Sequence, residues 1–334
     1  MFLYSPLRLQ KWWFTIAIKK VITVAPRGFC AGVDRAIKVV EDALDIFGLP
    51  VYVKHEIVHN KHVVADLAEK GAVTVENPHE APAGSVIIFS AHGSPPGHYE
   101  AAKKRNLRII DATCPLVTKV HLEVVRFARQ GYTIIYIGHK GHVEGIGVMG
   151  ELPAGEVAHV ENPQEVEQLA IGNPEKLIYL TQTTLSIDET LATIAALKKK
   201  YPQIRDPPRE DICYATTNRQ KAIKELAMAC DVILVVGSVT SSNSQRLLET
   251  AKAQGVAAYL VDDVSAVKEL WLAGKSSVGI SAGASAPDYL VQEIVSYFAS
   301  LGAAHEELVV QKEGVQFIPP RELVRAREER ATQK

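Results

Sequence analysis

Three of the four cysteines share a local sequence context that could prepare them to bind a metal. Cys30, Cys114 and Cys213 each stand where an extended segment is followed by a helical pattern: PRGFCAGVDRAIKVV, DATCPLVTKVHLEVV and DICYATTNRQKAIKEL. Free N–H groups at a helix N-terminus favour the thiolate, which is the form of cysteine that binds metals. The spacings are wide and contain no CxxC pair, so the fold has to bring the three side chains together.

The fourth cysteine, Cys230, has a different setting. It ends the segment AIKELAMAC and leads into DVILVVG, so its surroundings are apolar and we predict a structural role. The other three could hold zinc together with one histidine. They could also hold a 4Fe–4S cluster whose fourth iron has no cysteine ligand. Spacing alone leaves both open and slightly favours iron–sulfur, because structural zinc sites usually use locally paired cysteines.

Polar side chains that could bind a small anion follow several predicted strands, where ligands bind in open α/β sheets. Histidines, hydroxyls and backbone N–H groups can together hold a polyanion. There is no GxxxxGK[ST] motif and no GxGxxG in the first βα turn, which argues against nucleoside triphosphates and nicotinamide cofactors. Glu144, in the same loops, could deliver a proton. The anion-binding candidates are His59, His92, His142, Ser241, Ser242, Asn243 and Ser285.

Short apolar runs alternate with longer amphipathic stretches, as in an α/β protein. The runs are apolar on both faces, which is typical of a parallel sheet covered on both sides. We predict strands at 21–26, 85–90, 133–138, 176–181, 232–237 and 277–282. We predict helices that include 36–47, 117–130 and 218–229.

The three cysteine contexts recur about one small α/β unit apart, which predicts three similar units in tandem. We place an N-terminal extension at 1–20, units at 21–112, 113–210 and 211–305, and a C-terminal arm and charged tail at 306–334. Within the last segment, 315–320 could be a final strand or an arm, and the charged residues after it a solvated helix or a frayed tail.

The composition narrows the class of protein. The chain has 334 residues, of which 47% are hydrophobic and 22% charged, which suits a globular protein of two or three α/β units. The formal net charge of −1 gives no support for binding nucleic acid. No run of about 18 uncharged apolar residues predicts a membrane span. Four widely spaced cysteines fit a reducing, cytoplasmic compartment.

The chain resembles the 4-hydroxy-3-methylbut-2-enyl diphosphate reductase family, which acts last in the methylerythritol phosphate route to isoprenoids. The resemblance runs from about residue 21 to about residue 320 and rests on long motifs in a fixed order. These are PRGFCAGVDRAI, VHN, FSAHG, DATCPLVTKVH, TQTTLS, DICYATTNRQ, VVGSVTSSNSQRL and AGASAPD.

The resemblance implies a trefoil-like, pseudo-threefold arrangement of three α/β units around a central 4Fe–4S cluster. It implies that Cys30, Cys114 and Cys213 bind the cluster and leave one iron open. Glu144 would donate a proton and Thr183 would lie near the substrate hydroxyl. The three histidines would contact the substrate, and Ser241, Ser242, Asn243 and Ser285 would hold its diphosphate.

The implied reaction is a two-electron reductive dehydroxylation that gives isopentenyl and dimethylallyl diphosphate, with ferredoxin or flavodoxin as the electron donor. Two departures from the family pattern lie beside Glu144, where Val143 replaces a usual proline and Val148 a usual threonine. Two other hypotheses remain: a zinc enzyme that hydrolyses a phosphate ester, and a non-catalytic iron–sulfur sensor. The sequence leaves the oligomeric state open.

Overall fold

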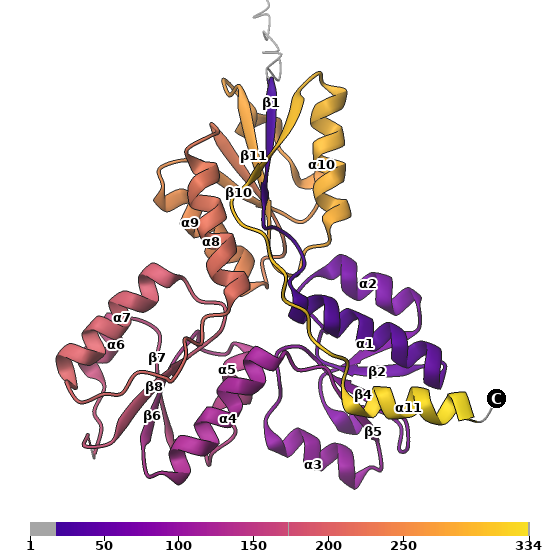
Figure 1. Ribbon diagram of the computed structural model, residues 1–334, viewed down its shortest axis with the longest axis vertical. Helices are drawn as coiled ribbons and strands as arrows, with labels where there is room; N and C mark the ends of the chain where they lie inside the picture. The colour runs from indigo at the N-terminus through magenta and orange to yellow at the C-terminus, as the bar shows by residue number, and fades with distance from the viewer. Residues whose placement is uncertain (1–17, 173, 333–334) are drawn as a thin grey trace, which may run out of the picture.

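Three parallel sheets, each covered by helices, make up the computed structural model, which describes residues 18–172 and 174–332. Every strand pair in the three sheets is parallel. In Figure 1 the three units surround a common centre. The prediction of an α/β fold with three similar units is confirmed. In the described residues, no helix is both long and apolar enough to cross a membrane.

The first unit contains a four-stranded sheet, and the second a three-stranded one. The order in the first sheet is β3 (Ala72–Val75), β2 (Val51–Lys54), β4 (Val86–Phe89), β5 (Arg108–Asp111). Its helices are α1 (Ala31–Phe47), α2 (Lys61–Glu69) and α3 (Pro96–Lys104). The second sheet has the order β7 (Val157–Val160), β6 (Thr133–Ile137), β8 (Leu177–Thr181). Its helices are α4 (Pro115–Arg129), α5 (Val143–Met149), α6 (Pro163–Gln168) and α7 (Ile187–Lys200).

The third unit has a five-stranded sheet in the order β10 (Ala257–Val261), β9 (Val232–Val236), β11 (Ser277–Ala282), β1 (Lys20–Ala25), β12 (Ala304–Val309). Its helices are α8 (Tyr214–Ala227), α9 (Ser242–Ala253) and α10 (Asp288–Ser300). The six predicted strands correspond to β1, β4, β6, β8, β9 and β11. They form because their apolar residues are buried, and all five residues of β9 and of β8 are buried.

The predicted boundaries of the first and third units are wrong at one strand. We assigned 21–26 to the first unit, but β1 pairs with β11 and with β12 in the third unit's sheet, so that Val21 lies between Val278 and His305. The physical reason is that β1 is apolar on both faces, and the interior of this sheet buries both. Strand β12 also crosses the predicted boundary at 305.

The predicted extension at 1–20 ends inside the fold. Ile18 is buried in the core of the third unit, and the N–H of Lys19 donates to the carbonyl of Ser276. The rest of the predicted extension, 1–17, lies outside the described residues.

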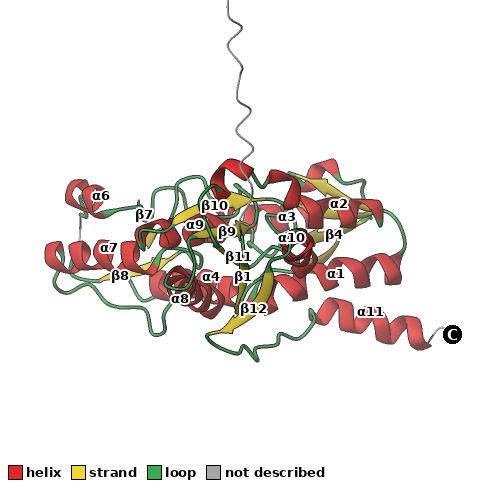
Figure 2. Ribbon diagram, turned by 90° about the horizontal axis from the view of Figure 1, so that it is seen from above, coloured by secondary structure: helices red, strands yellow, loops and turns green. Residues whose placement is uncertain are grey.

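The C-terminal segment 310–320 contains no strand. Of the two interpretations of 315–320, a final strand or an arm, the arm is therefore confirmed. It crosses from the third unit to the first, where α11 (Arg321–Thr332) begins (Figure 1). Figure 2 shows α11 running alongside α1, against which it buries Leu323 and Ala326. Arg330 pairs with Asp45 of α1 at 2.9 Å. The charged tail is therefore a docked, half-solvated helix.

The three cysteines lie where the chain passes from one unit to the next. Cys30 lies between β1 of the third unit and α1 of the first. Cys114 lies between β5 of the first unit and α4 of the second. Cys213 follows the segment that bridges to β8 at Arg205, and it precedes α8 of the third unit. The chain thus makes a closed circuit of the three units, with one cysteine at each crossing.

Candidate functional site

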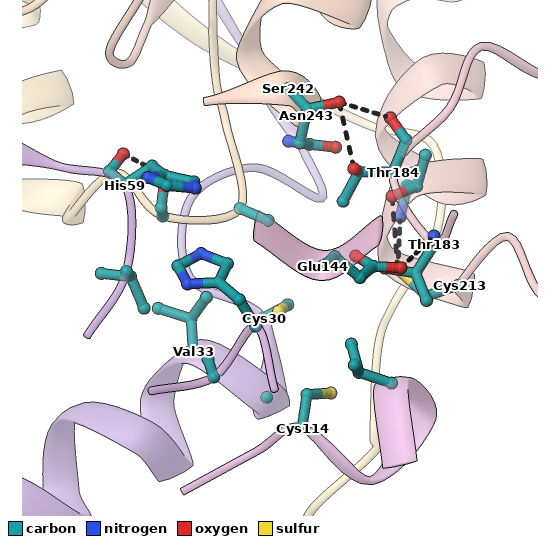
Figure 3. Close-up of a pocket in the computed structure, with 18 of the residues that line it drawn as sticks. Cys30, Val33, His59, Cys114, Glu144, Thr183, Thr184, Cys213, Ser242 and Asn243 are labelled. Carbon is teal, nitrogen blue, oxygen red and sulfur yellow. Dashed lines mark hydrogen bonds between the residues drawn. The ribbon is translucent and has the colours of Figure 1, made fainter. Parts of the chain in front are cut away.

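All twelve predicted site residues line one cavity where the three units meet (Figure 3). The first unit supplies His59 and His92, the second supplies the segments around Glu144 and Thr183, and the third supplies the serines and Asn243. The residues that the sequence predicted to converge therefore do lie around one cavity. The twelve are Cys30, Cys114, Cys213, His59, His92, His142, Glu144, Thr183, Ser241, Ser242, Asn243 and Ser285.

Each of the three cysteines caps the N-terminus of a helix, as the sequence predicted. Gly32 lies between two of them: a Cβ added there would be 2.7 Å from the Sγ of Cys114 and 3.8 Å from the Sγ of Cys30. Thr216 contacts the third, with its N–H donating to the Cys213 Sγ at 3.4 Å and its hydroxyl 3.2 Å from the same sulfur. These contacts fix the sulfurs around one side of the cavity.

The helix N–H groups favour the thiolate as expected, but at Cys114 and Cys213 burial opposes them and has the larger effect on the pKa. Burial raises the pKa of Cys114 to about 12, although N–H groups of its helix act in the opposite direction. Burial also raises the pKa of Cys213 to about 11, despite the contacts with Thr216. Desolvation of the charge therefore outweighs the helix N-terminus. A metal that binds here has to displace thiol protons.

The spacing of the sulfurs bears on the choice between zinc and a cluster. Among the described residues, the only three potential ligand atoms that all lie within 4.8 Å of one another belong to His55, His59 and His92. At least one pair of the three sulfurs is therefore more than 4.8 Å apart. A single zinc ion with bonds of about 2.3 Å requires its sulfurs closer together, whereas a multi-iron cluster separates its ligands. The cysteine set fits a cluster better than one ion.

The three predicted histidines form one cluster of rings. His59 and His92 stack with their centroids 4.1 Å apart, and His142 meets His59 edge-on at 5.8 Å. His142 also caps α5, because its Nδ1 accepts the N–H of Glu144. A fourth histidine, His55, lies 5.6 Å from His59 and pairs with Glu76. The rings of His59, His92 and His142 line the cavity, and His55 lies behind them.

Burial makes these rings poor proton acceptors while no anion is present. Burial lowers the pKa of His142 to about 3, with the neighbouring histidines adding to the shift. Burial also lowers the pKa of His92 well below its usual range, and His59 shifts the same way with Glu56 opposing. The rings are therefore neutral near pH 7. A bound polyanion would reverse this direction, because a nearby negative charge stabilises the imidazolium.

Glu144 is a buried carboxyl group held by one residue of the facing loop. Its Oε1 accepts the backbone N–H of Thr183 at 2.7 Å, and its Oε2 accepts the Thr183 hydroxyl at 2.8 Å (Figure 3). Burial raises the pKa of Glu144 to about 7, and the two hydrogen bonds from Thr183 oppose the shift. A carboxyl group with a pKa near neutrality can carry and release a proton at physiological pH.

The third unit lines the remaining wall with hydroxyl and amide groups. Ser241 caps α9 by accepting the N–H of Ser244. Ser285 donates to the carbonyl of His59 and lies 3.5 Å from the Ser241 hydroxyl, so it joins the third unit to the first. Both polar atoms of the buried Asn243 side chain have no hydrogen-bond partner. Buried polar groups are rarely left unpaired, which indicates a polar ligand at this wall.

Sequence reasoning missed several polar residues at this site. Gln182 is fully buried and donates to Thr184 at 2.9 Å and to Ser242 at 3.3 Å, which connects the second unit to the third. Thr184 in turn lies 3.0 Å from the Ser242 hydroxyl. The polar run TQTT at the end of a predicted strand was the available signal. The prediction chose only Thr183 from it.

Residues that we predicted to be outside the chemistry lie outside the cavity. Cys230 packs in the core of the third unit beside Gly279, and its Sγ donates to the carbonyl of Leu226. Val148 is fully buried between the second unit's sheet and α4. Val143 occupies the first position of α5, where proline is also well tolerated, so α5 forms in its absence.

Comparison with known proteins shows the family. The family model described as LytB protein matches residues 21–299, and the chain belongs to this family. A relative from Neisseria gonorrhoeae (strain ATCC 700825 / FA 1090) is 53% identical over 310 residues, which cover 92% of this chain and 96% of the relative. One from Alcanivorax borkumensis is 51% identical and covers 89% and 97%. Both are named 4-hydroxy-3-methylbut-2-enyl diphosphate reductase.

Solved structures of the same class share the fold. The E-1-hydroxy-2-methyl-but-2-enyl-4-diphosphate reductase from Plasmodium falciparum superposes with a TM-score of 0.91 at 38% identity, covering 94% of this chain and 99% of that one. A second structure, titled as the terminal enzyme of the non-mevalonate pathway, gives a TM-score of 0.62 at 32% identity and covers 84% and 99%. The resemblance inferred from the sequence motifs is thereby confirmed.

Proposed function

We propose that this protein is an oxidoreductase that converts 4-hydroxy-3-methylbut-2-enyl diphosphate to isopentenyl and dimethylallyl diphosphate by two-electron reductive dehydroxylation. The observation that carries the proposal is one cavity in which three cysteines, a carboxyl group of raised pKa and a wall of histidines and hydroxyls converge. The relatives named for this reaction match nearly the whole chain.

Cys30, Cys114 and Cys213 would hold a 4Fe–4S cluster with one iron left open. Their sulfurs border one side of the cavity, and the fourth cysteine lies outside it. When bound, the cluster would supply single electrons and a Lewis-acidic iron to the reaction. The electrons would come from ferredoxin or flavodoxin in the cytoplasm.

The polar walls would bind and orient the substrate. Its diphosphate would occupy the wall formed by His59, His92, Ser241, Asn243 and Ser285, where the unpaired amide and the neutral imidazoles can become donors to phosphate oxygens. The substrate hydroxyl would then lie toward Glu144 and Thr183. The apolar side chains of Val33, Val58 and Leu116 also line the cavity and would limit water around the reacting carbon atoms.

Glu144 would supply the proton that lets the hydroxyl leave as water. Burial keeps a large fraction of this carboxyl group protonated near pH 7. The two bonds from Thr183 fix its orientation in the cavity and stabilise the carboxylate that remains after transfer. This division of roles uses the two residues that the sequence resemblance assigned to the reaction.

Anaerobic purification followed by iron and acid-labile sulfide analysis tests the proposal. We expect about four of each per chain. The protein should also oxidise reduced viologen only when the hydroxylated diphosphate is added. Zinc without sulfide would favour the hydrolase, and an intact cluster without substrate-dependent oxidation would favour the sensor.

Replacing Gly32 with alanine should remove the cluster while leaving the fold. The new Cβ would lie 2.7 Å from the Cys114 sulfur, so close that the sulfur or the helix would have to move. It would also occupy space between Cys30 and Cys114. We expect iron and sulfide to fall to a small fraction of the wild-type content. Gly97→Ala is the matched control, because Gly97 is also helical and has open space at its Cβ. Equal iron content in the two variants would contradict the placement of the cluster.

Inorganic diphosphate should bind with net uptake of protons. The histidine pKa values are lowered in the empty cavity and should rise beside the anion, so affinity should increase as pH falls from about 8 to 6. Calorimetry in buffers of different ionisation enthalpy measures the uptake. His142→Asn should reduce it, whereas His79→Asn, on the exposed turn at Pro78–Glu80, should not. Identical uptake in all three proteins would exclude these imidazoles.

A further inference from the structure

Three cations outside the cavity repeat the same arrangement around the pseudo-threefold centre. Arg35, Lys119 and Arg219 each lie in the second turn of the helix that one cysteine caps. Each donates to backbone carbonyls shortly before the next of the three cysteines, which lies where the chain passes between a different pair of units. None of the three lines the cavity, and the proposed reaction does not use them.

The first member connects the Cys30 helix to Cys114. Arg35 Nη1 donates to the carbonyls of Ala112 and Thr113, at 3.1 Å each. These two residues directly precede Cys114. The Nε of Arg35 donates to the carbonyl of Ile318 in the C-terminal arm at 2.8 Å.

The second member connects the Cys114 helix to Cys213. Lys119 Nζ donates to the carbonyls of Arg209 and Glu210 at 2.7 and 3.4 Å, and it pairs with the buried carboxylate of Asp211 at 2.5 Å. The other oxygen of Asp211 accepts the N–H of Thr181 at the end of β8. The segment that leads to Cys213 is therefore fixed both to α4 and to the second sheet.

The third member connects the Cys213 helix to Cys30 and closes the circuit. Arg219 has no solvent exposure, and its Nε and Nη2 donate to the carbonyl of Gly28 at 3.1 and 2.8 Å. Nη2 also reaches the carbonyl of Phe29 at 3.3 Å. Glu313 of the C-terminal arm neutralises the guanidinium at 3.1 Å.

We propose that Arg35, Lys119 and Arg219 are a cyclic set of positioning residues, in which each cation anchored on one cysteine helix fixes the backbone that presents the next cysteine. This inference rests on the proposed cluster, which needs three sulfurs held at fixed, wide spacing. A carbonyl bonded to a charged donor is harder to displace than one bonded to water. The cycle therefore sets all three sulfur positions together, before metal arrives.

Arg35 also places positive charge near Cys114, whereas Lys119 and Arg219 are paired with the carboxylates of Asp211 and Glu313. A cation beside an iron–sulfur cluster stabilises its reduced, more negative form. Loss of the Arg35 charge should therefore lower the reduction potential of the cluster, and a conservative replacement that keeps the charge should preserve it. A purely structural contact would not distinguish charged from neutral replacements in this way.

Amide hydrogen exchange in the metal-free full-length chain tests which cysteine segment each cation fixes. In Arg35→Met, we expect exchange at 112–118 to accelerate about tenfold through loss of charged-donor hydrogen bonds, while 213–217 stays unchanged. In Lys119→Met, we expect the reverse: 213–217 accelerates and 112–118 does not. The test uses only Arg35 and Lys119, because Arg219 is fully buried and its replacement would disturb folding.

Arg105→Met is the matched control. Arg105 is also a half-buried arginine that donates two bonds to one carbonyl, that of Ala81, but both residues lie within the first unit. It should leave both cysteine segments unchanged. Exchange that is unaltered in the Arg35 and Lys119 variants, or accelerated throughout the chain, would overturn the cycle.

The holoprotein supplies an independent readout. Arg35→Met should lower the midpoint potential of the cluster, and Arg35→Lys should retain the wild-type value. Equal potentials in both variants would overturn the electrostatic part of the proposal. A wild-type protein without iron and sulfide would refute the proposed function instead, and the exchange experiment on the metal-free chain would still decide the positioning role.

Discussion

Glu144→Gln is expected to abolish most turnover while the protein keeps its cluster and its substrate. Glutamine has the same shape, and its amide oxygen can still accept the N–H of Thr183, so the loop should not move. It cannot release a proton, and loss of a general acid typically costs about 10²- to 10⁴-fold in rate. The measurement is steady-state viologen oxidation, with KM and iron content determined on the same preparation.

The pH profile sharpens this test. Because burial raises the pKa of Glu144 to about 7, the proton-carrying form is present below that pH and is lost above it. The wild-type rate should therefore decline as pH rises through about 7. The residual rate of Glu144→Gln should not show this decline with pH. Thr183→Ser, which keeps both hydrogen-bond donors, is the control that should retain the wild-type profile. Normal turnover by Glu144→Gln would remove Glu144 from the mechanism.

Cys114→Ser is expected to lose nearly all iron and sulfide, and the corresponding change at Cys230 to lose none. The hydroxyl of serine is a far weaker ligand for iron than thiolate, and Cys114 lies on the cavity beside Gly32. Cys230 is partly buried against an apolar core, where a serine hydroxyl can still donate to the carbonyl of Leu226. Metal analysis of the two anaerobically purified variants makes the comparison.

The two variants also serve as controls for each other. Both remove one sulfur atom from a partly buried position, so a general loss of folding would reduce iron in each. Cys230→Ser should cost about 1 kcal/mol in the free energy of unfolding, as core substitutions commonly do. A clear loss of iron in Cys230→Ser, with full content in Cys114→Ser, would show that the wrong cysteine was excluded.

The strands that sequence analysis found are those buried on both faces. Strands such as β9 and β8 read as continuous apolar runs because every residue is enclosed. Strands β3 and β12 contain mostly exposed or half-exposed residues, so no apolar run marks them. The position of β1 could not be found, because strand pairing between the two ends of a chain leaves no local pattern.

The sequence predicted which residues line the candidate site, but it did not predict the protonation states of its histidines and cysteines. Polar residues at the ends of buried strands were sufficient to select the cavity wall, including His59 and Asn243. The pKa of His142 and that of Cys114 depend on burial among side chains from other units, which sequence position does not reveal. Arg35 and Lys119 were unrecognised for a related reason, since their acceptors are backbone carbonyls distant in sequence.

The insertion of β1 between β11 and β12 has a consequence for synthesis. Strand β1 ends at Ala25, but its two neighbours begin only at Ser277 and Ala304, so β1 leaves the ribosome long before either of them is made. The sheet that orients the backbone before Cys30 therefore cannot assemble until β11 and β12 have been translated. Such long-range pairing also implies slow folding, because the loop between the partners must close first. If Cys30 binds a cluster as proposed, its ligand position is set only after β1 has paired with β11 and β12, so the Cys30 thiol exists in the growing chain before its site does.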